Sequence, residues 1–76
     1  MMRKIPSTEI PWYIDRVVRI VYFAKETIQG NAIVIDNRIT GPVQLIAYDK
    51  PNQKITFQRP NGMQETLTPL EVFDPA

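Results

Sequence analysis

Residues 16–36 read RVVRIVYFAKETIQGNAIVID, the densest run of branched and aromatic apolar residues in the chain. Valine, isoleucine, tyrosine and phenylalanine favour the pleated surface of a β-strand. The run therefore predicts two strands, residues 16–25 and 28–36, joined by a polar turn at residues 25–27. In this register Gly30 falls inside the second strand and indicates a bulge or a barrel corner. An alternative register puts the turn at Gly30-Asn31 and lengthens both strands.

The first of these strands is apolar on both sides. One face is wholly apolar and holds Val18, Ile20, Tyr22 and Ala24. The other holds Val17, Val21 and Phe23 together with Arg19 and Lys25. A strand that is apolar on both faces is usually covered on both. In a chain of 76 residues the second cover is either the N-terminal segment or another subunit. The hairpin therefore predicts self-association, with Val21 and Phe23 among the interface residues.

The rest of the chain alternates short apolar segments with turns. Residues 43–50, 54–59 and 63–68 read as strands, and Ile55 and Phe57 are expected to point into the core. The turn signals are residues 36–38, residues 40–42 and, strongest of all, Pro60-Asn61-Gly62. Residues 1–7 read as a loose terminus, residues 8–15 as one helical turn, and residues 69–73 as a closing 3₁₀ turn or edge pairing. Strands at this spacing predict an all-β domain, with residues 16–73 forming a small barrel.

The composition excludes several chemistries. The sequence has no cysteine and no histidine, so disulfides, the common zinc sites and Ser-His or Cys-His catalysis cannot be built. The three glycines are isolated from one another, so a glycine-rich phosphate loop is missing. We therefore expect no enzyme activity, no metal and no other cofactor. Because no apolar run approaches the roughly 18 residues of a membrane span, we also expect a cytoplasmic protein without a membrane partner.

The net charge is small but unevenly distributed. Residues 1–59 carry nine basic and five acidic side chains, a balance of +4, and residues 60–76 carry three acidic side chains and no base, a balance of −3. Basic groups bind phosphates and exposed aromatic rings stack on bases, so a mildly basic face predicts a nucleic-acid interface. Its candidate residues are Arg16, Arg19, Arg38, Tyr48, Lys50, Lys54 and Arg59. Alternatively, these charges keep exposed strand edges from pairing with other chains.

Protein recognition is the competing class. Small barrels bind extended peptides by strand addition or in aromatic-lined grooves, and Trp12, Tyr13 and Tyr48 could line one. Trp12 decides between two arrangements, since a buried tryptophan would plug the barrel and an exposed one would mark an interface. We favour the plug. For the protein-interaction alternative, the candidate interface residues are Trp12, Tyr13, Val21 and Phe23, and a homo-oligomer is the expected assembly.

A helical turn ahead of the first strand, and a glycine six residues before an aspartate in GNAIVID (30–36), resemble the small-barrel group of SH3-like, Tudor-like and Sm-like domains. The glycine-to-aspartate spacing is similar to the first Sm motif, and residues 16–36 are similar to the corresponding stretch of bacterial Sm-like RNA chaperones. The resemblance implies a five-stranded SH3-like or Sm-like barrel, and RNA binding in a ring. Sm proteins place an asparagine or an equivalent base-contacting residue shortly after the aspartate. Here Asn37 follows Asp36 immediately, and Arg38 is the next polar candidate. The closing segment ETLTPLEVF also lacks the glycine and the lysine-histidine pair of the second Sm motif.

Taken together, these patterns predict a non-catalytic binding module that contacts RNA or DNA through a mildly basic face. The alternative is a protein-interaction or regulatory adaptor module that acts as a homo-oligomer without touching nucleic acid.

Overall fold

The protein is an antiparallel all-β structure. The computed structural model describes residues 2–76, with residues 25–27 described by their backbone alone. The all-β prediction is confirmed, because strands and one short 3₁₀ helix make up the regular structure of this part of the chain. The elements are β1 (Arg3–Lys4), η1 (Ile10–Tyr13), β2 (Val17–Gln29), β3 (Ala32–Ile39), β4 (Val43–Asp49), β5 (Lys54–Gln58), β6 (Gln64–Leu67) and β7 (Pro69–Asp74).

The strands follow the order β1-β7-β2-β4-β5-β6, and β3 pairs with β2 off this path. β7 therefore lies between β1 and β2, where the sequence predicted a closing turn or an edge pairing. Within the described residues no pairing joins β6 to β1, so hydrogen bonds do not close the sheet. The predicted five-stranded barrel is not confirmed. No helix in this part of the chain has the length and apolar character needed to cross a membrane.

The core is formed by side chains from η1, β2, β4, β5 and β7, together with Ile5. Residues of β2, β4 and β5 alternate between core and solvent, as expected for strands covered on one face. Ile55 and Phe57 are fully buried, which confirms the inward face predicted for this strand. The buried apolar residues are Ile5, Ile10, Tyr13, Val18, Ile20, Val43, Leu45, Ile55, Phe57 and Val72.

The N-terminal segment differs from the loose terminus that the sequence predicted. Arg3 and Lys4 pair with Asp74 and Phe73 of β7. The backbone N–H of Ile5 donates to the carbonyl of Val72 at 2.8 Å, and the Ile5 side chain is buried. The segment is held in place because β1 pairs with the edge of β7 and the Ile5 side chain packs in the core.

The 3₁₀ helix η1 lies within the predicted helical turn, but the face that it buries is not the face of Trp12. A 3₁₀ helix has three residues per turn, so Ile10 and Tyr13 share one face, and both are buried. Trp12 falls on another face and is 69% exposed. The interpretation of Trp12 as the plug is therefore wrong, and Tyr13, predicted at an interface, belongs to the core.

The hydroxyl of Tyr13 ties both ends of the chain to η1. It accepts a hydrogen bond from the Arg3 guanidinium and donates one to the Asp74 carboxylate at 3.0 Å. The backbone N–H of Ala76 also donates to Asp74. The pKa of Asp74 is lowered, chiefly by the Ala76 bond and then by the bond from Tyr13. This network satisfies the polar end of a ring whose body is buried.

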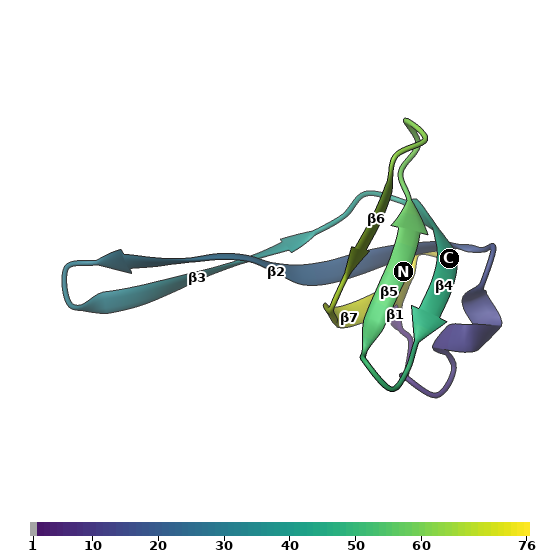
Figure 1. Cartoon of the computed structure of the whole chain (residues 1–76), viewed down its shortest axis with the longest axis horizontal. Coiled ribbons are helices and arrows are strands. Elements are labelled where there is room, and N and C mark those ends of the chain that lie inside the picture. The colour runs from purple at the N-terminus through teal and green to yellow at the C-terminus, as the bar shows by residue number, and fades with distance from the viewer. Residues whose placement is uncertain (1) are drawn as a thin grey trace.

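The β2–β3 hairpin extends far beyond the rest of the molecule, as Figure 1 shows. We call residues 23–39 the arm, and the remaining structure the body. The alternative register is correct: the strands turn at Gly30-Asn31, where Gly30 has a φ of +61°, as at the first position of a type II′ turn. The turns predicted at residues 25–27 and 36–38 are wrong, because β2 and β3 continue through them. Gly30 therefore lies at the arm's tip and not at a barrel corner.

The arm determines the overall shape. The 13 residues of β2 span about 44 Å at 3.4 Å per residue, which matches the longest extent of the molecule, 43 × 28 × 27 Å. The radius of gyration is 13.4 Å, whereas a compact chain of this length has roughly 11 Å. About half of β2 therefore lies outside the body.

Thr40 fastens the base of the arm. Its backbone N–H donates to the carbonyl of Ile20 at 2.8 Å, and its hydroxyl accepts from the N–H of Ile20 at 3.0 Å. The Arg19 guanidinium donates to the Thr40 carbonyl, also at 3.0 Å. Thr40 is buried, so these bonds are shielded from water and fix where β3 leaves the body.

Candidate interaction surface

The pairing of β2 with β3 gives the arm one apolar face. Residues directly opposite each other in an antiparallel pair lie on the same face of the ribbon. Ile28 pairs with Ile33, and Phe23 pairs with Asn37. Ile35 and Ile39 share the face of Ile33 because they follow it at even spacing along β3. The exposed residues of this apolar face are Phe23 (49%), Ile28 (75%), Ile33 (63%), Ile35 (59%) and Ile39 (43%).

A bulge in β2 is what gathers these side chains. The register shifts by one residue between Phe23 and Lys25, so Ala24 is the extra residue of β2. A one-residue shift turns every following side chain to the opposite face. Without the bulge, Ile28 and Phe23 would lie on opposite faces of the ribbon. With the bulge, both lie on the face of Ile33. The result is a ribbon with one predominantly apolar face, on which the register also places Glu26, opposite Ile35.

The opposite face of the arm is more polar. Asp36 and Arg38 of β3 lie there and form an ion pair, with 3.3 Å between Nε of Arg38 and Oδ2 of Asp36. Val34 lies on the same face, between Ala32 and Asp36 along β3, and is 41% exposed. The arm is therefore amphipathic, as strands covered on one side are.

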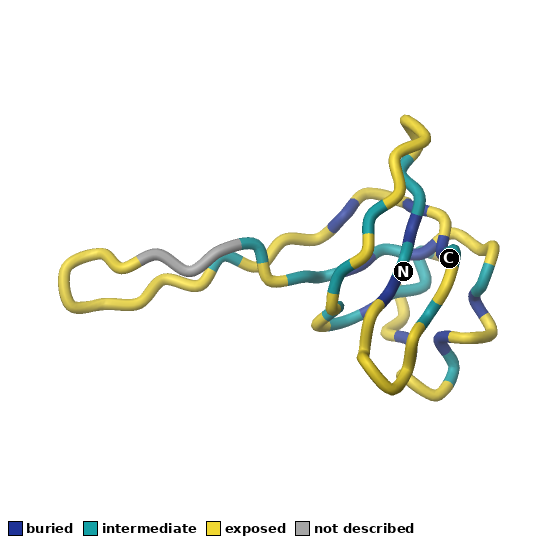
Figure 2. Tube along the Cα trace, viewed as in Figure 1, coloured by how far each residue is buried: buried dark blue, intermediate teal, exposed yellow. Residues whose placement is uncertain are grey.

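The body leaves the apolar face uncovered. Beyond Tyr22, β2 pairs with β3 alone, and β3 has no other strand partner within the described chain. Figure 2 shows exposed residues along most of the arm and at its tip. Five apolar side chains that are each about half exposed leave on the order of 500 Å² uncovered, the size at which an apolar patch usually marks an interaction site.

Sequence reasoning found part of this surface. Phe23 lies on the apolar face, and Val21 lies at its base, half-buried and paired with Ile39. Trp12 is exposed on η1, in the body, so the structure does not bring it to the arm. The isoleucines at 28, 33, 35 and 39 were missed. The alternation Ile33, Ile35, Asn37, Ile39 was a signal for them, but the turn predicted at residues 36–38 interrupted it.

The predicted nucleic-acid residues do not form one surface. Arg19, Arg38 and Arg59 bond within the chain, to the Thr40 carbonyl, Asp36 and Glu65 respectively. Arg16 lies over the Tyr13 ring, 5.8 Å from its centroid. Tyr48 is half-buried against the core. Lys50 and Lys54 are the two that the fold brings together, at the ends of the β4–β5 turn, where both are exposed.

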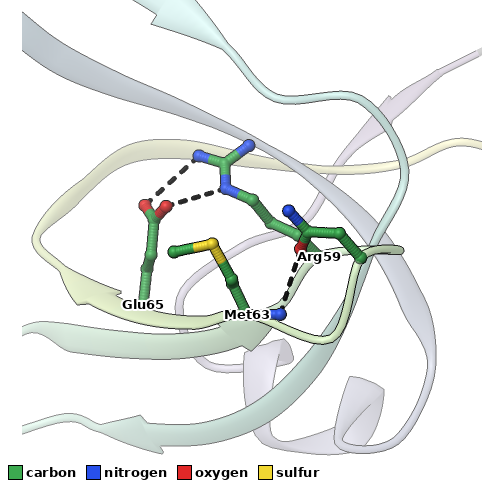
Figure 3. A network of polar contacts seen from close by, with 4 residues as sticks. Arg59, Met63 and Glu65 are labelled. Carbon is green, nitrogen blue, oxygen red and sulfur yellow. Dashed lines mark hydrogen bonds and ion pairs between the residues drawn. The ribbon is translucent and has the colours of Figure 1, made fainter.

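Arg59 and Glu65 form an ion pair with two hydrogen bonds across the β5–β6 hairpin, shown in Figure 3. The distance from Nε of Arg59 to Oε1 of Glu65 is 2.8 Å, and that from Nη2 to Oε2 is 3.2 Å. The backbone N–H of Arg59 donates to the Met63 carbonyl, which holds the connecting loop closed. The guanidinium also lies 5.4 Å from the centroid of the Phe57 ring. Arg59 therefore has a structural role in the body.

This pair predicts a weak dependence of stability on acid pH. The hydrogen bonds from Arg59 are the main reason that the pKa of Glu65 lies below its ordinary value of 4.5. Since the folded pKa is the lower one, the stabilisation is complete above pH 4.5 and is lost as the pH falls through the folded pKa. Both side chains are partly exposed, so we expect a contribution of at most about 1 kcal/mol.

Urea unfolding of the native protein and of Glu65→Gln, from pH 7 to pH 3, measures this contribution. The difference in unfolding free energy should shrink toward the acid end of the range. A difference that stays constant with pH would show that the carboxylate charge of Glu65 contributes nothing.

One cleft of about 550 Å³ lies in the body, away from the arm. Both apolar and charged residues border it, so its lining favours no single ligand chemistry. The described residues also hold no cluster of three or more carboxylate side chains that could bind a metal ion. The cleft lining is Lys4, Ile5, Pro6, Ser7, Ile10, Tyr48, Gln53, Pro69, Leu70, Glu71 and Val72.

Comparison with known proteins finds no matching family model, no matching curated protein and no matching solved structure.

Proposed function

We propose that the protein is a non-catalytic protein-interaction module and that the apolar face of the arm is its binding surface. The observation that carries this proposal is the group of five half-exposed apolar side chains on one face of a ribbon that the body leaves bare. A two-stranded ribbon is at best marginally stable in water, and a further layer on its apolar face would stabilise it.

The energetics favour a protein partner. Covering about 500 Å² of apolar surface stabilises a complex by on the order of 12 kcal/mol, at about 25 cal/mol per Å². The partner's own apolar surface contributes a similar amount, whereas association costs on the order of 4 to 15 kcal/mol. A partner with a matching apolar surface can therefore bind stably, and one with a highly charged surface cannot.

Site-specific photo-crosslinking in cells that make the protein tests this function. A photoreactive residue at position 33 lies on the apolar face, and one at position 34 lies on the opposite face of the same strand. We expect position 33 to give defined crosslinked protein products and position 34 to give far fewer. No product at 33, or equal products at both positions, would refute the apolar face as the binding surface.

Nucleic-acid binding is a second candidate, supported by the exposed pair Lys50 and Lys54. Neither lysine takes part in an ion pair with another described residue. The expected result is a gel shift at low salt with protein at tens of micromolar, the range of non-specific binding, and a weaker dependence on salt in Lys54→Ala. No shift under these conditions would exclude this candidate.

Kinship with SH3-like or Sm-like domains stays a prediction. The 3₁₀ turn ahead of the first long strand and the β4–β5–β6 meander support it. The long arm and the unclosed sheet are the two features that differ from the predicted five-stranded barrel.

A further inference from the structure

We propose that the apolar face of the arm binds the same face of a second copy, so that two arms pack face to face around a two-fold axis. This inference rests on the proposed function and names its partner. The two ribbons would form a small two-layer sandwich, about 10 Å thick between sheets. Each copy would thereby supply the layer that the other copy's arm lacks.

The chemistry of the face suits contact with itself. In a two-fold contact the same patch occurs on both sides, so any charge near the axis meets its own kind. The described side chains of this face, Phe23, Ile28, Ile33, Ile35, Asn37 and Ile39, carry no charge, and the register places one acidic residue on the face, Glu26 opposite Ile35. The opposite face carries Asp36 and Arg38, which pair with each other within the strand. Apart from the Glu26 position, the apolar face can therefore meet its copy without like-charge repulsion.

The size of the face suits a dimer. An interface is on average about 57% non-polar, so an apolar patch of about 500 Å² corresponds to roughly 850 Å² per partner once its polar rim is included. A stable interface of standard size buries about 800 Å² per partner. The apolar patch therefore matches the non-polar share of such an interface, about 450 Å² of the 800 Å² on each partner.

The shape of the molecule leaves room for this contact. The arm extends away from the body in Figure 1, and residues beyond Tyr22 in β2 contact β3 as their strand partner. The molecule is 43 Å long but only 28 and 27 Å across, because the arm lies along its longest axis (Figure 1). Pairing between strand edges would leave the five apolar side chains in water, which is why we infer packing of the faces.

Light scattering on the full-length chain across a concentration series tests the proposal. We expect the native protein to reach a mass twice the 8.8 kDa of one chain. Ile33→Glu places a carboxylate on the apolar face of both copies, and we expect it to weaken the dimer by roughly 100-fold or more. Val34→Glu is the matched control on the opposite face, and we expect it to remain a dimer.

Circular dichroism on each variant, together with the second variant Ile35→Glu, separates loss of association from unfolding. A native protein that stays monomeric at its highest attainable concentration would overturn the proposal. A dimer that survives both Ile33→Glu and Ile35→Glu would overturn it as well, as would one that Val34→Glu disrupts equally.

A single-cysteine scan gives an independent readout, because the native chain has no cysteine. Cysteine placed in turn at positions 28, 33 and 35 should give a disulfide-linked dimer at one or more of them, and cysteine at position 34 should not. Disulfides that form only at position 34 would contradict face-to-face packing.

The two proposals fail in different ways. Crosslinks from position 33 to another protein, with a monomeric mass, would refute the second copy and leave the proposed function standing. No crosslink and a monomeric mass would refute both.

Discussion

Phe57→Ala is expected to remove a large part of the stability of the fold. Phe57 is the largest of the fully buried side chains and lies on β5, which pairs with β4 on one side and β6 on the other. Truncation of a buried phenylalanine costs about 3 to 5 kcal/mol. The whole stability of a 76-residue domain is on the order of 4 to 11 kcal/mol, so the mutation removes much or all of it.

Phe23→Ala is the matched control, since it removes the same atoms from a half-exposed ring on the arm. Thermal unfolding followed by circular dichroism should show a large drop in the melting temperature for Phe57→Ala. The control should show a small change when the two are compared at a concentration where the chain is monomeric. Similar losses in both variants would contradict the assignment of the core to the body.

Excising the outer arm is expected to leave the body folded and to abolish self-association. Replacing residues 24–36 by Asn-Gly joins Phe23 to Asn37, which pair directly across the ribbon, through a two-residue turn. None of the ten buried apolar residues lies in the excised segment. We therefore expect the unfolding free energy to change by no more than about 1 kcal/mol, and the mass to be that of one chain.

Urea unfolding and light scattering on the shortened chain measure the two effects separately. An unfolded product would show that the arm contributes to the stability of the body. A folded product that still forms dimers would place the interface elsewhere, for which the exposed Trp12 of η1 is the next candidate.

The parts of the fold that sequence patterns predicted are those governed by local alternation and turn chemistry. Ile55 and Phe57 alternate with polar neighbours, and their strand lies where that alternation put it. The break at residues 60–62 is also confirmed, with Gly62 at a φ of +90°. These features depend on residues close in sequence, so one segment contains all the information required.

The parts that sequence patterns missed depend on distant or absent neighbours. Residues 25–27 and 36–38 are polar enough to read as turns, but on a ribbon exposed to solvent on both sides polar residues fit a strand equally well. Only the pairing itself shows that they are strand residues. The short strand β1 likewise exists because β7, some 70 residues later, offers it an edge.

The candidate site was predictable in its location and not in its extent. The strand apolar on both faces pointed to self-association through residues 16–36, and the arm lies there. The extra residue at Ala24, which brings Ile28 and Phe23 onto one face, is not marked by any residue type that signals a bulge. Similarly, the Arg59–Glu65 pair depends on the β5–β6 register, so counting charges alone overstated the basic surface.

The arm also has a consequence for the order in which the molecule is made. Its strands meet across a two-residue turn, whereas β2 joins β7 through pairs such as Arg19 and Phe73, which are 54 residues apart (73 minus 19). Hairpins form within about 1 to 10 μs, and pairings with long sequence separation form more slowly. A growing chain can therefore complete the arm before β7 has been synthesised, while the core is still open. If arms of neighbouring nascent chains meet at that stage, assembly begins before folding ends, and the spacing of ribosomes on one message would influence the yield of paired protein.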